Sequence, residues 1–492
     1  MHTKTWPLYL GLTPLFVVPV WAAGGTFKPW QGSFLWITLF AWICFFAAAP
    51  HNIHRSRGKR LNQMVRDPLI WLAILFMGFL CLQYFNSGRI RFFDFDLNQW
   101  AYSPPQHPFL PWSIARAEAF EMIRWFAPIL SAFLILRHSW KRLSPRILLW
   151  IVCLNGFLNA LLSFVHSHLG WEKMYNIQQF GKDVYGSFGY PNHGAVFFIL
   201  LFALALGLLL RELLVESSER DLPTLCFAAV WTPLFFMAAN LSTSRAGILG
   251  SWLVLLLAVV SIMCIAWPRI HPVQRLYTFL AAGILFAGMA AVFILFTQPV
   301  HLRELRKATV DLNVYTEFSA RFFQVEAAWL MWLDHPWYGV GGWGYRYLLA
   351  EYLPMESWRL MMGKGKANVH HDLMQFLVEF GLIGFSLLTG VFLPTLLQHI
   401  RNVFRRPLLD QSVWANPLRI CAFWGLLILL ADSQIDIPLR SPAVFIHGIL
   451  LFYLLVPHDE LPSIWNPVTD WKRLQPPPKG MRNRVWGVHP EN

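Results

Sequence analysis

Charged residues are scarce in this chain of 492 residues: they make up 14% of it, whereas hydrophobic residues make up 56%. Soluble domains usually carry about a quarter charged residues, so the composition argues against a water-soluble protein. The chain has no Cys-x-x-Cys pair, and its six cysteines all lie in apolar segments, which argues against a disulfide framework and a cysteine metal site. It also has no fixed-period repeat.

Long apolar runs are what the sequence has instead. Most approach the roughly 20 residues that a helix needs to cross the hydrocarbon core, and helices are required there because unpaired backbone amides are costly in lipid. We therefore expect an all-α, polytopic integral membrane protein with about twelve transmembrane helices. These are residues 8–24, 32–49, 68–85, 121–137, 147–165, 193–210, 223–240, 247–266, 276–297, 373–397, 417–432 and 441–456.

The distribution of Lys and Arg predicts the orientation of these spans. With the N-terminus inside, the cytoplasmic segments hold 22 of the 40 basic residues, whereas the short connections outside hold eight. The net charge of +13 is then largely a topological signal and does not indicate a nucleic-acid partner. Both termini are expected in the cytoplasm, with residues 1–456 as the membrane domain and 457–492 as a cytoplasmic tail near membrane lipids.

Two insertions, 86–119 and 298–372, are much longer than the other connections, and both face outward in this topology. We therefore expect the functional site on the outer face. Prolines in the first insertion exclude a regular helix there. The second, between spans nine and ten, contains 319–333, where apolar side chains recur at helical spacing. This segment predicts an amphipathic helix that lies at the membrane surface or caps the bundle, is ended by the Asp-His-Pro that follows, and precedes a glycine-rich turn region.

Charged residues at the outer ends of spans are candidates for chemistry, because burying them near lipid is costly unless they have a role. Arg245 and Ser244 lie in a connection of only a few residues. Its guanidinium is suited to phosphate oxygens, although an interfacial arginine with no other role is an equal interpretation. Arg321 begins the amphipathic helix, where an ordinary solvated charge is the alternative.

A pair of histidines marks the point where the long loop re-enters the membrane. His370 and His371 precede Asp372, and if the helix has begun there, His371, Gln375 and Glu379 lie on one face. An imidazole titrates near neutral pH and is suited to be a general base; a polar helix cap is the alternative. A metal site is disfavoured because no second cluster of His or Cys lies outside.

The connection between the last two spans, 432–440, is short and polar. It carries Asp436 and Arg440, which could pair with each other and fasten the connection. The alternative is that they orient Arg245 or His370.

Three stretches of the chain carry recognisable motifs. They are Gly186-Ser187-Phe188-Gly189-Tyr190-Pro191-Asn192-His193, Ser244-Arg245-Ala246-Gly247-Ile248-Leu249, and Arg321 through Asp334-His335-Pro336-Trp337-Tyr338-Gly339-Val340-Gly341 to His370, Gln375, Glu379 and Gly381. Together, over residues 185–440, they resemble the O-antigen ligase and O-antigen polymerase family of bacterial envelope proteins, which includes the pilin O-oligosaccharyltransferases. His371 stands where many members have Asn. The ten residues between His370 and Gly381 match the family's spacing, which favours His370 as the acting histidine.

The resemblance implies a metal-independent glycosyltransferase with no cofactor, which moves a glycan from undecaprenyl diphosphate to an acceptor hydroxyl on the outer face of the bacterial inner membrane. By this resemblance, Arg245 and Arg321 would hold the diphosphate and stabilise its charge as it leaves, and His370 would take the proton from the attacking hydroxyl. The acceptor stays open between the lipid A core, a growing polysaccharide and a pilin or other protein. The further substrate contacts that we expect are Asn192, Ser244, His371, Gln375, Asp436 and Arg440.

Two other classes of function remain open at this point. A transporter or flippase of the same lipid-linked glycan would show paired repeats and spans interrupted at mid-membrane, whereas the polar residues here cluster at one face. A structural membrane scaffold would leave the arginine and histidine motifs unexplained.

Overall fold

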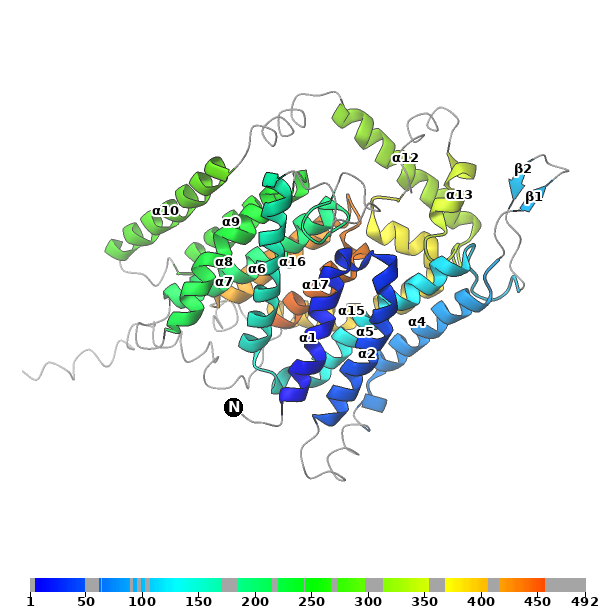
Figure 1. Cartoon of the computed structure of the whole chain (residues 1–492), viewed down its shortest axis with the longest axis horizontal. Coiled ribbons are helices and arrows are strands. Elements are labelled where there is room, and N and C mark those ends of the chain that lie inside the picture. Colours follow the sequence, from blue (N-terminus) through cyan, green and yellow to red (C-terminus); the bar gives the residue numbers. More distant parts are fainter. Residues whose placement is uncertain are drawn as a thin grey trace, which may run out of the picture.

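The computed structural model describes residues 5–48, 62, 64–88, 92–94, 99–101, 107–169, 184–214, 220–242, 244–266, 272–296, 313–353, 368–405 and 416–455. The predicted tail, 457–492, lies outside these residues, as do 298–312 and 354–367 of the long loop. Each of the twelve apolar segments coincides with a described helix (Figure 1). These helices are α1 (Trp6–Trp21), α2 (Lys28–Ala47), α4 (Pro68–Phe85), α5 (Arg116–Ser139), α6 (Pro145–Leu169), α7 (Pro191–Leu214), α8 (Leu222–Leu241), α9 (Arg245–Ala266), α10 (Pro272–Phe296), α15 (Asp372–Arg405), α16 (Pro417–Asp432) and α17 (Pro442–Leu454).

Eight of these helices are long and apolar enough to cross a membrane: α2, α4, α5, α6, α7, α8, α9 and α15. Helices α1 and α16, with 16 residues each, and α17, with 13, fall short of the roughly 20 residues that a span needs. Helix α10, with 25 residues, has the length of a span but is not among the eight. The described chain is therefore a polytopic membrane protein with eight candidate spans, and the count of twelve stays a prediction.

Local sequence signals set where several helices begin. In α4, α16 and α17 a proline opens the helix, where its missing N–H costs no hydrogen bond. The residue before each proline is a capping residue, which satisfies one of the free backbone N–H groups of the first turn. Asp67 accepts from Leu69 N at 3.1 Å, Asn416 from Leu418 N at 3.0 Å and Ser441 from Val444 N at 3.4 Å.

The core is built around α7 and α17. In α7, every residue from Ala195 to Leu206 is at most 1% exposed, and the helix packs against α8, α9 and α16. Helix α17 contacts α7 and α16 on one side and α1 and α5 on the other, so it joins the two groups of helices. The starts of α7 and α17, which flank the candidate site, are thereby fixed by the best-packed part of the bundle.

The two long insertions meet at one end of the bundle, which we call the loop end (Figure 1). Ile114 N donates to Val340 O at 3.4 Å. Gly341 has φ +85° and approaches so closely that a Cβ there would lie 2.4 Å from Ser113 Oγ. Both insertions therefore lie on the same face of the protein, as the predicted topology requires.

The insertions contain more secondary structure than the sequence predicts. Within 86–119, strands β1 (Phe92–Asp94) and β2 (Gln99–Ala101) pair antiparallel, with Phe93 opposite Trp100. The all-α fold is confirmed for the described residues apart from this hairpin, which the sequence does not reveal because three-residue strands are too short to give a readable alternation of side chains. In the long loop, α12 (Asn313–Asp334) confirms the amphipathic helix and ends at the predicted residue.

Helix α12 starts earlier than 319–333, and a further short helix, α13 (Tyr345–Tyr352), follows the glycine-rich region. The face of α12 that carries Ala327, Ala328 and Met331 is buried, and the helix packs against α13 and α15. Trp329 and Leu333 on its other face are exposed. Helix α12 thus caps the bundle at the loop end, which was one of the two predicted positions.

A break in α15 explains why the glycine-rich region is needed. Gly381 has φ +61°, which interrupts the helix, and the backbone of 336–341 fills the gap: Gly341 N donates to Glu379 O at 2.8 Å and Leu382 N to Pro336 O at 2.7 Å. A Cβ on Gly339 would lie 2.5 Å from Gly381 N, and a Cβ on Gly381 would lie 2.4 Å from Gly339 N. Only glycine fits at both positions.

This contact predicts that Gly381→Ala destabilises the protein. The alanine would combine an unfavourable φ with a backbone clash, and left-handed backbone alone costs about 1–3 kcal/mol for a residue other than glycine. Gly78→Ala is the matched control, because no atom lies within 4 Å of a Cβ at Gly78 in α4. Thermal unfolding of the detergent-solubilised protein should show a lower midpoint for Gly381→Ala and no decrease for Gly78→Ala. Equal midpoints would contradict the interpretation of the break.

Candidate active site

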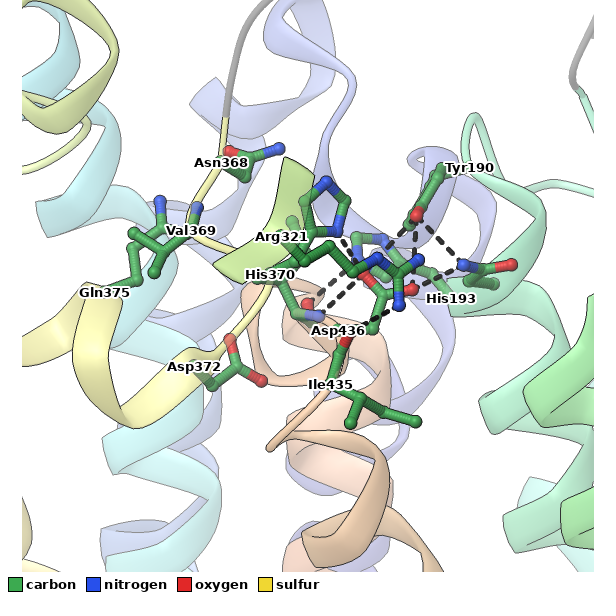
Figure 2. Close-up of polar contacts among 12 residues, drawn as sticks. Tyr190, His193, Arg321, Asn368, Val369, His370, Asp372, Gln375, Ile435 and Asp436 are labelled. Carbon is green, nitrogen blue, oxygen red and sulfur yellow. Dashed lines mark hydrogen bonds and ion pairs between the residues drawn. The ribbon is translucent and has the colours of Figure 1, made fainter. Parts of the chain in front are cut away.

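Asp436, in the connection between α16 and α17, is the centre of a polar cluster at the loop end (Figure 2). It is 3% exposed. Its carboxylate accepts hydrogen bonds from Asn192 Nδ2, from the Tyr190 hydroxyl at 3.2 Å and from the backbone N–H of Ile437 at 2.9 Å. Its Oδ1 also lies 3.0 Å from Nδ1 of His370. A buried carboxylate is thus bonded by groups from the start of α7, from its own connection and from the end of the long loop.

The positive and hydrogen-bonding neighbours determine the ionisation of Asp436. Burial by itself raises the pKa of its carboxyl, but the hydrogen bond and charge of His370, the hydrogen bond from Asn192 and the charge of His193 outweigh this and lower the pKa to about 2. Asp436 is therefore an anion at neutral pH. The same carboxylate, after the larger effect of burial, raises the pKa of Tyr190, which remains a neutral donor.

The two adjacent histidines have different positions. His371 caps α15, since its Nδ1 accepts the backbone N–H of Met374 at 3.3 Å. His370 has φ +54°, which turns its ring away from the helix axis and toward Asp436 (Figure 2). The predicted polar helix cap is therefore His371, whereas His370 is the histidine that pairs with the carboxylate of Asp436. With its Nδ1 proton donated to Asp436, His370 has Nε2 as its basic nitrogen.

Arg321 reaches this cluster from α12. Its guanidinium donates to the backbone oxygen of Ile435 at 2.8 Å, directly beside Asp436. Figure 2 shows the side chain extending from α12 toward the His370–Asp436 pair. The long loop thus brings a cation next to a histidine that lies far from it in the sequence.

A second group of hydrogen-bonded residues adjoins the cluster and is fully buried. The Val369 N–H donates to Gln375 Oε1 at 3.2 Å, Gln375 donates to Glu379 at 2.9 Å, and Arg440 lies 2.7 Å from Glu379 Oε2. Gln375, Glu379 and Arg440 are each at most 1% exposed. The shared face of Gln375 and Glu379 is confirmed. Both Gln375 and Arg440, expected as substrate contacts, are bonded to protein groups here.

The predicted pairing of Asp436 with Arg440 is wrong. Between them, Pro438 to Arg440 form a 3₁₀ turn, η5, and the arginine points into the core. There its guanidinium lies 4.4 Å from the ring centre of Phe376 and pairs with Glu379. A charge that is enclosed by protein needs a partner in the same environment, and Glu379 provides it.

Arg245 and Ser244 lie at the same end of the bundle but are not among the groups that contact Asp436. Ser244 Oγ accepts the N–H of Gly247 at 3.3 Å, which makes Ser244 the cap of α9. A Cβ on Gly247 would lie 2.8 Å from Ala195 Cβ, so the start of α9 packs against the first turn of α7, which carries Asn192. Arg245, the first residue of α9, is exposed there.

Two members of the cluster, Tyr190 and His193, were not predicted from the sequence. Tyr190 bonds Asp436, and His193, which is 5% exposed, lies with its Nε2 3.0 Å from the oxygen of Ile437. The available signal was a polar Tyr-Pro-Asn-His segment directly before the long apolar run of α7. Its meaning depends on Asp436, which is more than 240 residues away.

Comparison with known proteins agrees with the motifs from which this site is built. Residues 228–389 match the family model described as O-Antigen ligase. The matched segment includes Arg245, Arg321 and His370, whereas Asn192 and Asp436 lie outside it. A search of curated proteins found no match. Within residues 228–389, the chain is thus similar to the O-antigen ligase family.

Proposed function

We propose that this protein transfers a glycan from undecaprenyl diphosphate to an acceptor hydroxyl at the periplasmic face of the bacterial inner membrane, without a metal or cofactor. The family supports glycan transfer in a membrane. The observation that carries the specific proposal is the His370–Asp436 pair, 3.0 Å apart at the loop end, with Arg321 beside it. A base oriented by a carboxylate, next to a cation, is suited to a reaction in which a hydroxyl attacks and a diphosphate leaves.

In the proposed reaction, His370 and Asp436 act on the acceptor. The acceptor oxygen forms a bond to the anomeric carbon while the bond from that carbon to the diphosphate breaks, and the hydroxyl proton passes to Nε2 of His370. Asp436 holds the ring through Nδ1 and stabilises the imidazolium that forms. Asn192 and Tyr190 in turn hold the carboxylate in place.

The proposed role of the arginines is to bind the diphosphate. Arg321 lies beside the pair, and Arg245 is exposed at the start of α9 on the same end of the bundle. Guanidinium groups bind phosphate oxygens in a bidentate manner. Fixed cations at this level meet the headgroup of a lipid-linked donor while its polyprenyl chain stays in the bilayer. The acceptor is a lipid A core, a growing polysaccharide or a protein hydroxyl, and the product of the assay below identifies it.

The first prediction from this proposal compares the adjacent histidines, His370 and His371. His370→Ala should lower transfer by about 100-fold or more, because general-base catalysis contributes about 10²–10⁴-fold. His371→Asn should retain most activity, because asparagine is also a good helix cap. The assay uses membranes with the protein, undecaprenyl-diphosphate-linked glycan from the same host and an acceptor. It follows free undecaprenyl diphosphate and labelled glycan.

Two outcomes of this assay contradict the proposal. One is equal transfer by wild type and His370→Ala. The other is glycan flux across the membrane without any transfer by wild type, which is the result expected of a transporter or flippase. Equal amounts of each variant in the membrane, measured by immunoblot, are required for the comparison.

The second prediction concerns pH. Asp436 stays ionised down to about pH 2, so a loss of activity on acidification above that pH should report protonation of a group other than Asp436. Asp436→Asn removes the charge that stabilises the imidazolium, and should lower kcat by up to about 10⁴-fold. It should also move the acidic limb of the pH–rate profile to lower pH. An unchanged limb would show that Asp436 does not act on the titrating group.

A further inference from the structure

The proposed function requires His370 and Asp436 to stay within hydrogen-bond distance, although they belong to separate segments 66 residues apart. His370 ends the long loop just before α15, and Asp436 lies in the connection from α16 to α17. A hydrogen bond fails when its length grows by less than 1 Å. Some contact between the two segments must therefore hold them together with that accuracy.

Asp372, two residues after His370, makes this contact at both ends of the connection. Its backbone N–H donates to Ser433 O at 2.8 Å, and its carboxylate Oδ2 accepts the N–H of Leu439 at 2.8 Å. Residues 433 and 439 lie on either side of Asp436. One residue thus joins the start of α15 to both sides of the turn that carries the carboxylate.

The surroundings of Asp372 are unusual for a residue with only a structural role. It is 0% exposed, and among the described residues its other oxygen, Oδ1, has no hydrogen-bond partner. An unsatisfied buried carboxylate oxygen opposes folding. The side chain also does not cap its own helix, since that role belongs to His371. Its one side-chain hydrogen bond is directed at the Asp436 turn.

The geometry points to Asp372 as a positioning residue that sets the His370–Asp436 distance by clamping the 433–439 turn onto the start of α15. This inference rests on the proposed function, because it assigns Asp372 an effect only through that pair. Asp372 itself does not touch substrate in this assignment. The position of its hydrogen-bond acceptor, rather than the presence of a carboxyl group, is what matters.

Three substitutions separate the position of the acceptor from the presence of a carboxyl group. Asp372→Asn keeps an acceptor in the same place and should retain activity. Asp372→Glu keeps the carboxyl group but moves the acceptor by one methylene, and should lower kcat. Asp372→Ala removes the acceptor and should lower kcat about 10- to 100-fold, with less than about 3-fold change in the KM for the donor, because a displacement of about 1 Å can cost 10²-fold.

The pH–rate profile provides a readout that a general loss of structure does not move. The groups that face His370 are Asp436 from the α16–α17 connection, His193 from α7 and Arg321 from α12; Asp432 lies one turn before Asp436. Asp372→Ala and Asp372→Glu should move the acidic limb to lower pH, as is expected of Asp436→Asn. In the Asp436→Asn background, Asp372→Ala should have little further effect on kcat.

The outcomes distinguish this inference from the proposed function. If wild type transfers no glycan, the proposed function fails. If wild type transfers glycan and Asp436→Asn impairs it, but Asp372→Ala matches wild type, only the clamp is refuted. Loss of activity in Asp372→Asn with full activity in Asp372→Glu would also refute it, because a carboxyl group, and not the position of the acceptor, would then be the property required. Should Asp372→Ala not fold, as judged by size-exclusion chromatography, the Asn and Glu variants still decide.

Discussion

A carboxylate enclosed at the end of a membrane bundle must be hydrogen-bonded, and this requirement at Asp436 organises the loop end. The group is 3% exposed and is bonded by His370, Asn192, Tyr190 and the backbone of Ile437. These partners come from three parts of the chain. Satisfying one anion therefore determines how the start of α7, the start of α15 and the α16–α17 connection are placed relative to each other.

Backbone contacts make this arrangement possible. The break at Gly381 allows 336–341 to bond directly to α15, and this contact ties the long loop to the bundle next to the site. Helix α12 immediately precedes that segment and packs on α15, so Arg321 is brought to Ile435. The glycines are thus remote from the proposed chemistry, yet they place the cation that takes part in it.

Features that depend on neighbouring residues could be predicted from the sequence. Apolar runs marked twelve of the described helices, and the amphipathic pattern marked α12. These signals are local, since helical periodicity repeats every few residues and a capping residue lies next to the helix that it begins. The predicted helices are therefore the part of the fold that the sequence describes best.

Features that depend on distant residues could not be predicted. Arg440 and Asp436 are four positions apart and of opposite charge, so a local pair was the natural expectation. The η5 turn points the arginine to Glu379 instead. Tyr190 and His193 had no visible role without knowledge of where Asp436 lies. The choice of partner for a buried charge is made in three dimensions, where the alternative partners compete, and sequence distance carries little information about it.

The position of the polar residues also bears on the class of function. A transporter binds its substrate near mid-membrane between repeats, with broken helices at that depth. Here the His370–Asp436 pair, Arg321, Arg245 and the first residues of α7, α9 and α15 are all at the loop end. Helix starts carry partial positive charge, which adds to that of the arginines where a diphosphate would be bound. Chemistry on a donor held in one leaflet requires such a one-sided site, whereas passage across the membrane does not.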